Sequence, residues 1–182
     1  TLAEIGPALM PTLDPDMGAL LTDTLTSRGI RILTRTPVTK IEKADGLLTV
    51  SGENGEIGSF DMVLVAAGVR PETALAEAIG IPTGTAGAIC VNRRMETRIP
   101  GIYAAGDCVE TWHQILDRND YMPLGSTAHK QGRIAGMNAA GRKAEFKGIV
   151  GTQVVKVFDR VIARTGLKET EAEAAGMQPF SV

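Results

Sequence analysis

The chain has 182 residues, a net charge of −2, and 43% hydrophobic and 22% charged residues. This composition is typical of a folded protein and argues against intrinsic disorder. The near-neutral charge provides no basic surface for nucleic acid or anionic lipid, and no apolar run approaches the roughly 18 residues that span a bilayer. Two cysteines are too few for a disulfide scaffold, which favours a reducing, cytoplasmic location.

Residues 1–69 form the first predicted unit. The stretch 1–4 has the pattern of the end of a strand. A helix is expected to begin at Asp14-Pro15-Asp16, because these residues favour the N-cap, the first helical position and the positive helix end in that order. Strands are expected at 30–34, 38–42, 47–51 and 61–66. The last of them is an uninterrupted apolar run, which is the pattern of a buried parallel strand.

Residues 70–148 form the second predicted unit. Short strands are expected at 88–91 and 102–104, a loop at 107–121, and helices at 71–79 and 124–140. The long helix contains Gly132 and Gly136, each of which costs about 1 kcal/mol relative to Ala. We therefore expect both glycines to pack closely against another backbone.

Residues 149–182 form the third predicted unit. Two alternating stretches, 153–158 and 161–165, predict a hairpin with its turn at 159–160, and a short helix is expected at 168–175. A hairpin with one helix cannot bury a core of its own. This unit is therefore expected to be cut short, and the absence of Met at position 1 also indicates a truncated or processed chain.

The strongest motif is the segment 97–107, TRIPGIYAAGD. A short strand ends here in small residues, which let a ligand approach the backbone, and then in an acid that can accept hydrogen bonds from sugar hydroxyls. The residue spacing alone fits two interpretations equally well: a ligand-binding strand end, or an ordinary strand and turn with an acid on the surface. Every defined position is nevertheless similar to the second FAD-binding motif of the pyridine nucleotide–disulfide oxidoreductases. This resemblance implies that Gly106 and Asp107 belong to an FAD site, with Asp107 on a ribityl hydroxyl.

The resemblance extends over nearly the whole chain in the family's order. It implies an α/β fold of partial FAD- and NAD(P)-binding Rossmann-like domains, three-layered and with a β-meander, followed by the start of an α+β interface domain. Residues 1–69 correspond to the C-terminal part of the NAD(P)-binding domain and 70–148 to the second segment of the FAD-binding domain. Residues 149–182 correspond to the truncated start of the dimerisation domain, which implies a homodimer or higher homo-oligomer. The most similar subgroup is that of NADH oxidases and coenzyme A-disulfide reductases.

A second segment, 63–71 with the sequence VLVAAGVRP, is by itself an ordinary strand-to-helix connection. In its place in the chain it resembles the family's Ala-Thr-Gly-type segment, with Ala67 where Thr is usual. The resemblance implies that Gly68 lies close to the nicotinamide side of NAD(P)H.

A third segment, 123–133 with the sequence PLGSTAHKQGR, can begin a helix whose N–H groups stabilise negative charge. The family's corresponding helix points at the pyrimidine edge of the flavin. Leu124, Gly125 and Ser126 are the matching positions. His129, further along the helix, fits a solvated helix face.

Glu4 follows the first expected strand. An acid at the end of the second strand of a dinucleotide fold can bind the ribose 2′-OH and repel a 2′-phosphate. Within the family resemblance, Glu4 is therefore expected to favour NADH over NADPH. The alternative is a surface Glu beside a strand.

The chain lacks the G-x-G-x-x-G pattern that opens a dinucleotide fold. The family carries two such patterns and a redox-active cysteine, all expected upstream of Thr1. Cys90 fits a small core hydrophobe and Cys108 a packing residue, so neither is assigned a catalytic role. His113 could face the flavin or a partner subunit, but a lone His is more often structural. No metal site is expected.

The leading hypothesis is a flavoprotein oxidoreductase that uses FAD and NAD(P)H, with NADH preferred. A hydride would pass from the nicotinamide to FAD and on to a small-molecule disulfide, a polysulfide or oxygen, while the 182-residue chain alone would be inactive. A second hypothesis is a catalytically silent fragment that self-associates through exposed sheet edges. A third is a ferredoxin-reductase-like electron carrier, against which the segment 153–167 argues. Nucleic acid and membranes are not expected as partners.

Overall fold

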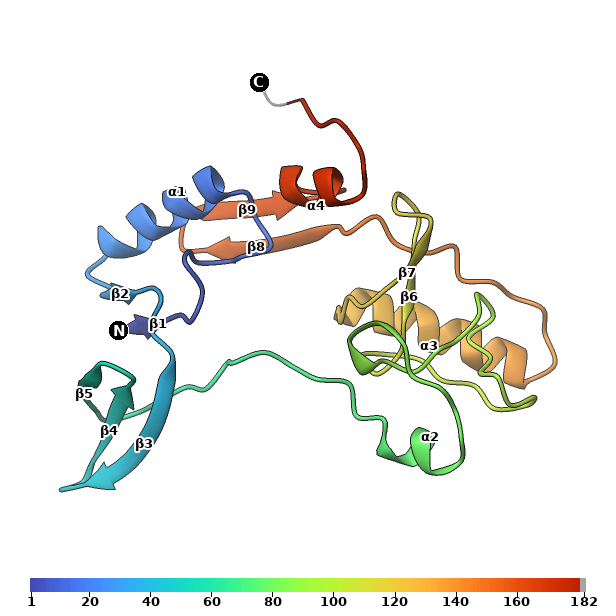
Figure 1. The fold of residues 1–182 in the computed structure, drawn as a ribbon, viewed down its shortest axis with the longest axis horizontal. Helices are drawn as coiled ribbons and strands as arrows, with labels where there is room; N and C mark the ends of the chain where they lie inside the picture. The colour runs from blue at the N-terminus through green and yellow to red at the C-terminus, as the bar shows by residue number, and fades with distance from the viewer. Residues whose placement is uncertain (181–182) are drawn as a thin grey trace. The chain divides into compact units, whose positions relative to one another are not determined.

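A computed structural model describes residues 1–180. The chain forms two compact units, one built on Thr1–Ala67 and the other on Gly68–Gln178 (Figure 1). Across residues 1–180, no helix combines the length and the apolar character needed to cross a membrane.

The first unit begins with a small parallel β–α–β element. β1 (Leu2–Ala3) pairs in parallel with β2 (Ile32–Leu33), and α1 (Pro15–Thr26) connects the two strands. Leu21 and Leu25 of α1 are buried, with 5% and 8% of their surface exposed. The predicted strand at the N-terminus and the helix starting at Pro15 are confirmed, and the strand predicted at 30–34 is shorter than expected.

A β-meander follows in the same unit. β3 (Val38–Ala44), β4 (Leu47–Gly52) and β5 (Gly55–Phe60) form an antiparallel sheet in the order β3-β4-β5. Asp45 and Gly46 connect the first two strands with φ values of 51° and 84°, the conformation that tight hairpin turns require. The two predicted strands in this region are confirmed.

The strand β5 was not predicted from the sequence. Gly55 and Gly58 interrupt its pattern, and glycine weakens a strand when its sequence is considered alone. Pairing with β4 supports it instead, with Leu48 opposite Phe60. Gly58 has a packing role, because a Cβ at this position would lie 3.1 Å from Cζ of Phe60.

The prediction of a buried strand at 61–66 is wrong for this structure. These residues belong to no strand, and Met62 and Leu64 have 82% and 88% of their surface exposed. An apolar parallel strand is stable only when neighbouring strands take its hydrogen bonds and other elements cover both faces. Within residues 1–180, no strand pairs with this segment.

The second unit begins with two short helical turns. α2 (Ala74–Ala78) is shorter than the helix predicted at 71–79, and a 3₁₀ turn, η1 (Thr85–Gly87), follows it. The strands predicted at 88–91 and 102–104 are present only as isolated bridges, in which Ile89 pairs with Thr83 and Val109, and Tyr103 pairs with Glu96. Each bridge joins one residue pair, which is too little to form a ladder.

The region 107–121, predicted as a loop, contains a hairpin. β6 (Thr111–His113) pairs antiparallel with β7 (Arg118–Asp120). The prediction was wrong because three-residue strands have no measurable period, and β6 gains a second neighbour far along the chain. Gln114 N–H donates to the carbonyl of Ile149 over 2.8 Å.

The long helix α3 (Gly125–Ala139) is confirmed. Gly132 and Gly136 do not pack against another backbone, because a Cβ at either position would meet no atom within 4 Å outside its own helix. The core of this unit is a cluster of seven buried residues: Ala76, Ile81, Ile89, Val91, Met95, Val109 and Phe146.

The second unit ends with a hairpin and a short helix. β8 (Gln153–Val157) and β9 (Arg160–Arg164) pair antiparallel, with the turn at 158–159 rather than 159–160, and α4 (Glu169–Ala174) follows. Arg164 Nη2 donates to Glu171 Oε2 over 2.7 Å and joins β9 to α4. Burial by itself would raise the pKa of Glu171, but the hydrogen bonds from Arg164 and from the Lys168 N–H outweigh it and lower the pKa below its ordinary value.

Candidate functional site

The turn at Gly106 is held against α3 by a buried side chain. The Gly106 N–H donates to Gln131 Oε1 over 3.0 Å. Gly106 adopts a φ of +98°, which favours glycine. A Cβ there would lie 4.0 Å from Cβ of Ala128, so this turn runs close beside the second turn of α3.

Asp107 is exposed at this turn, so its carboxylate can reach a ligand. Its backbone is held in place, since the Tyr121 hydroxyl donates to the Asp107 carbonyl over 2.9 Å. Burial raises the pKa of Tyr121, and the nearby Asp107 and Cys108 raise it further. Tyr121 therefore keeps its proton and remains a donor at neutral pH.

The N-terminus of α3 presents hydrogen-bond donors. Leu124 is the N-cap with extended backbone (φ −134°, ψ 129°), and its carbonyl accepts from the N–H groups of Thr127 and Ala128 at 2.8 and 2.9 Å. The N–H groups of Gly125 and Ser126 lie in the first turn, where an α-helix supplies no partner for them. A Cβ at Gly125 would meet no atom within 4 Å, and the first turn contains no acidic residue. This helix end therefore offers space, N–H donors and a positive dipole to a negatively polarised group.

The structure thus brings five of the predicted residues into one neighbourhood of the second unit. Gly106 and Asp107 come from one segment, and Leu124, Gly125 and Ser126 from the start of α3, with Gln131 connecting the two. An exposed carboxylate can accept hydrogen bonds from hydroxyl groups, and the helix end can donate them to carbonyl or anionic oxygens. The combination suits a ligand that carries both kinds of group.

Glu4 lies in the first unit, directly after β1. Its N–H donates to the Leu33 carbonyl over 2.8 Å, which aligns it with the end of β2. Its carboxylate accepts the Gly6 N–H at 2.6 Å, and a Cβ at Gly6 would lie 3.0 Å from that same oxygen. The acid is therefore held at the carboxyl end of two parallel strands, which is where dinucleotide folds bind ligands.

Gly68 is the first residue of the second unit. It is exposed, adopts a φ of +92°, and a Cβ there would meet no atom within 4 Å. Glu4 and Gly68 belong to different units, and each of these two predicted nucleotide-binding residues is described within its own unit.

His113 is buried, with 1% of its surface exposed. Its Nδ1 accepts the Leu116 N–H over 3.3 Å. Burial lowers the pKa of His113, although the carboxylates of Asp120 and Glu171 oppose this effect. These contacts place His113 inside the packing between the β6–β7 hairpin and the chain that follows α3.

Neither cysteine forms a disulfide. Burial raises the pKa of Cys90, and the carboxylate of Glu110 raises it further. Cys108 packs against the core and its thiol donates to the Ala105 carbonyl over 3.7 Å. Among residues 1–180, no group of three or more His, Cys, Asp and Glu side chains could hold a metal ion.

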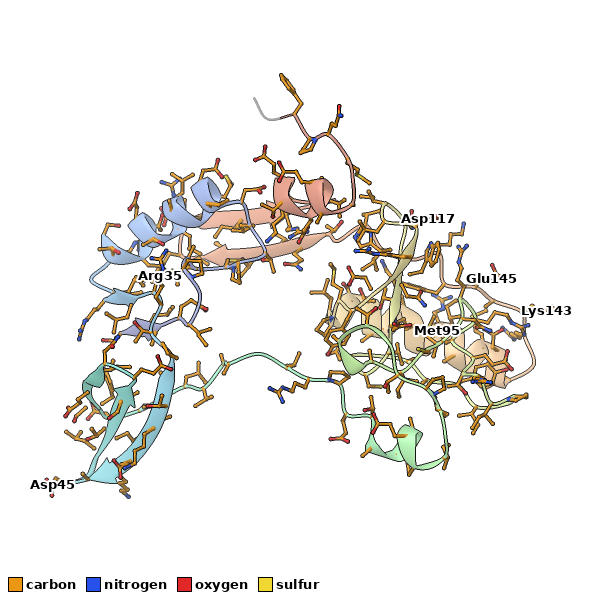
Figure 2. All side chains as sticks on the ribbon, viewed as in Figure 1. Arg35, Asp45, Met95, Asp117, Lys143 and Glu145 are labelled. Carbon is orange, nitrogen blue, oxygen red and sulfur yellow. The ribbon has the colours of Figure 1, made fainter. Side chains whose placement is uncertain are left out.

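One surface hollow of about 570 Å³ lies elsewhere in the second unit. Glu145, one of its lining residues, lies on the segment that follows α3 (Figure 2). All of its lining residues differ from the predicted site residues: Arg93, Trp112, Gln114, Glu145 and Lys147. The predicted site is an exposed surface rather than this hollow.

Sequence reasoning assigned no role to Gln131, Tyr121 or Asn138. Gln131 and Asn138 are buried polar residues on one face of α3, together with Thr127. Their spacing of four and seven residues matches the buried face of a helix. Amides on an otherwise packed helix face must find hydrogen-bond partners inside the protein. The helical spacing, together with this requirement, could have identified Gln131 and Asn138 as buried polar residues.

Comparison with known proteins extends these observations. The family model described as Pyridine nucleotide-disulphide oxidoreductase matches residues 1–132. The chain is 38% identical over 135 residues to the NAD(P)H sulfur oxidoreductase (CoA-dependent) of Pyrococcus furiosus, covering 74% of this chain and 30% of that protein. It is also 38% identical over 170 residues to the NADH oxidase of Methanocaldococcus jannaschii, covering 91% of this chain and 37% of that protein.

The fold is similar to solved structures as well. An FAD-dependent pyridine nucleotide-disulphide oxidoreductase from Desulfovibrio vulgaris superposes with a TM-score of 0.87 at 33% identity, covering 96% of this chain and 44% of that one. The chain is therefore a mixed α/β structure that matches part of an FAD- and NAD(P)-binding oxidoreductase. It spans about a third of the length of the curated relatives it matches.

Proposed function

This chain belongs to the pyridine nucleotide-disulphide oxidoreductase family, and from that premise we propose that it is part of a flavoprotein oxidoreductase that uses NAD(P)H. The observation that carries the proposal is the neighbourhood of Asp107 and the N-terminus of α3, fixed by the hydrogen bond between Gly106 and Gln131. When bound, FAD would supply the hydride relay from the nicotinamide to a disulfide, a polysulfide or oxygen.

The residues of the second unit fit the polar groups of a flavin. The carboxylate of Asp107 would accept hydrogen bonds from ribityl hydroxyls. The N–H groups of Gly125 and Ser126 would donate to the pyrimidine edge, where the helix dipole favours negative charge. Leu124 would set the start of the helix through its extended N-cap backbone.

The ribose of the nucleotide would be bound through the first unit. Glu4, at the carboxyl end of β1, would accept hydrogen bonds from the ribose 2′-OH and disfavour a 2′-phosphate, which gives a preference for NADH. Gly68 would allow close approach of the nicotinamide side, because glycine leaves the backbone uncovered. Residues 1–69 and 70–148 would then be segments of the NAD(P)- and FAD-binding domains.

Residues 149–182 would begin the interface domain of a homodimer. The hairpin supports this proposal, since Val154 and Val161 have 71% and 65% of their surface exposed on the same face of β8 and β9. Exposed apolar residues in a group mark surfaces that another protein covers.

The test of the proposed function is Asp107→Ala in the complete protein that carries this chain. Losing hydrogen bonds to a charged acceptor costs about 1.5–3 kcal/mol, which corresponds to roughly one to two decades of FAD affinity. Flavin absorbance per protein after gel filtration measures the loss. Asp61→Ala removes an exposed acid outside this neighbourhood and serves as the control. Equal flavin content in both variants would contradict the assignment of Asp107.

A second candidate function is a catalytically silent, self-associating fragment. Met62, Leu64 and Leu75 favour it, since each has more than 80% of its surface exposed. The colour of the complete protein that carries this chain distinguishes the candidates, because a bound flavin absorbs visible light and a protein without flavin does not.

A further inference from the structure

We propose that Gln131 is a positioning residue of the FAD site, which fixes the Gly106–Asp107 turn relative to the N-terminus of α3. This inference rests on the proposed function, since it concerns how the two parts of that site are kept together. Gln131 does not touch the ligand in this proposal and acts only through the groups that it holds.

The geometry singles out this side chain. Gln131 has 0% of its surface exposed. Its Oε1 accepts the Gly106 N–H at 3.0 Å, and its Nε2 donates to Thr111 Oγ1 at 2.8 Å. One planar amide therefore connects three segments: the turn that carries Asp107, the strand β6, and α3. A side-chain amide offers both the acceptor and the donor that these two bonds use.

The need for such a connection follows from the site itself. Asp107 and the first turn of α3 come from segments separated by the whole β6–β7 hairpin, so local backbone structure does not align them. A shift of α3 by a single residue along its axis would displace its N–H groups by about 1.5 Å. The hydrogen bond from Gly106 to Gln131, made two turns into α3, opposes that shift.

The same helix provides an internal control. Asn138 lies two turns further along and is also buried, with 4% of its surface exposed. Its Nδ2 lies within hydrogen-bonding distance of the Arg94 and Ala144 carbonyls, at 2.9 and 2.8 Å. Figure 2 labels Met95 and Lys143, the sequence neighbours of these partners. Asn138 thus braces α3 without contacting Gly106 or Asp107.

The experiment compares Gln131→Met and Asn138→Leu in the complete protein. Methionine has a similar length and adapts to irregular packing, yet it accepts no strong hydrogen bond. The melting temperature reports the loss of stability in each variant. The dissociation constant of FAD and the midpoint potential of the bound flavin report alignment of the site.

We expect Gln131→Met to weaken FAD binding by about tenfold or more. Its midpoint potential should also become more negative, because a misaligned helix end stabilises the added negative charge less. Asn138→Leu should lower the melting temperature while FAD affinity and potential stay close to wild type. Gln131→Glu retains an acceptor for the Gly106 N–H and can accept from the Thr111 hydroxyl, so it should restore FAD affinity.

The outcomes separate the two proposals. A wild-type protein that retains no FAD overturns the proposed function and this inference with it. A yellow wild type in which Gln131→Met and Asn138→Leu change affinity and potential equally overturns the positioning role alone. If Gln131→Met does not fold, Gln131→Glu decides: near wild-type FAD affinity supports the role, and a tenfold loss of affinity overturns it.

Discussion

At the scale of single residues, buried polar side chains connect the segments of the second unit. Glu110, with 6% of its surface exposed, accepts the Thr85 N–H at 2.6 Å and Nδ2 of Asn119 at 3.1 Å. Gln131 and Asn138 make comparable links from α3. Removing one partner of such a bond leaves the other buried without compensation, which costs about 1–3 kcal/mol. Short strands and single bridges are therefore supported by side chains as much as by backbone ladders.

Glu4 should set the choice of nucleotide. We expect the complete protein to have a higher kcat/KM for NADH than for NADPH, since the carboxylate would pair with a 2′-OH and repel a 2′-phosphate. Glu4→Gln removes the charge and keeps an acceptor for the Gly6 N–H. Steady-state kinetics should show the preference reduced by about tenfold, equivalent to roughly 1.4 kcal/mol. Glu72→Gln, an exposed acid of the second unit, is the control, and an NADPH preference in the wild type would place Glu4 away from the ribose.

His113 should make stability depend on pH. Its pKa in the folded protein is lowered, first by burial, relative to an ordinary value of 6.5. The unfolded chain therefore binds protons more readily, so the contribution of His113 is complete above pH 6.5 and is lost as the pH falls below that value. The carboxylate of Glu171 loses its contribution only at lower pH, below 4.5.

Thermal melts between pH 7.5 and pH 5.5 test this expectation, with both limits chosen to bracket the ordinary histidine pKa. His113→Asn can retain an acceptor for the Leu116 N–H, and it should lower the melting temperature at pH 7.5 but lose less stability on acidification than the wild type. His129→Asn changes the other histidine, which is exposed on α3, and should follow the wild-type curve. Parallel curves for the wild type and His113→Asn would rule out a titrating role for His113.

At the scale of elements, Gly132 and Gly136 give a direct test of packing. A Cβ at either glycine would meet no atom within 4 Å outside the helix. Alanine is preferred over glycine inside helices by about 0.5–1 kcal/mol, so Gly132→Ala should raise the melting temperature of the 182-residue chain. Gly106→Ala should lower it, because the φ of +98° at this residue disfavours a side chain. Destabilisation by Gly132→Ala would indicate that another chain covers this face of α3.

The elements predicted correctly from sequence are those with local signals. Pro15 at the start of α1, the Asp45-Gly46 turn of the meander, and the first residues of α3 act within a few positions of themselves. The strand predicted at 61–66 is absent because a strand of this kind depends on partner strands elsewhere in the chain. β5 was not predicted because its own sequence is a weak strand pattern, and its pairing with β4 supports it. The candidate site followed a similar division: the motif at 97–107 predicted Asp107 as a site residue, and helix periodicity could have marked Gln131 as buried. The hydrogen bond between Gln131 and Gly106 could be identified only from the folded chain.

At the scale of the whole molecule, large apolar side chains are exposed in both units. Leu64, Leu75 and Phe180 have 88%, 82% and 87% of their surface exposed. Large apolar side chains with this much exposed surface can be covered by another protein or by another part of the same one. We therefore expect the 182-residue chain to form oligomers in solution, which light scattering coupled to gel filtration would measure.

The same chain should be colourless and inactive with NADH. A dinucleotide pyrophosphate is bound by a glycine-rich turn and the helix N-terminus that follows it, and the sequence contains no G-x-G-x-x-G pattern. Asp107 and the N-terminus of α3 would bind only the ribityl and flavin portions. Each missing charge-assisted hydrogen bond is worth about 1.5–3 kcal/mol, so two or three of them amount to roughly 3–9 kcal/mol, or two to six decades of affinity.

Titration of the purified chain with FAD, followed by flavin fluorescence, measures this loss of affinity directly. NADH consumption, followed by the absorbance of the reduced nicotinamide at about 340 nm, measures activity. The complete protein, treated in the same way, is the control and should be yellow. Asp107→Ala in the short chain should change neither measurement, since the affinity is already lost. A yellow monomer that oxidises NADH would contradict the expectation, because it would mean that the pyrophosphate is bound by residues other than a glycine-rich turn.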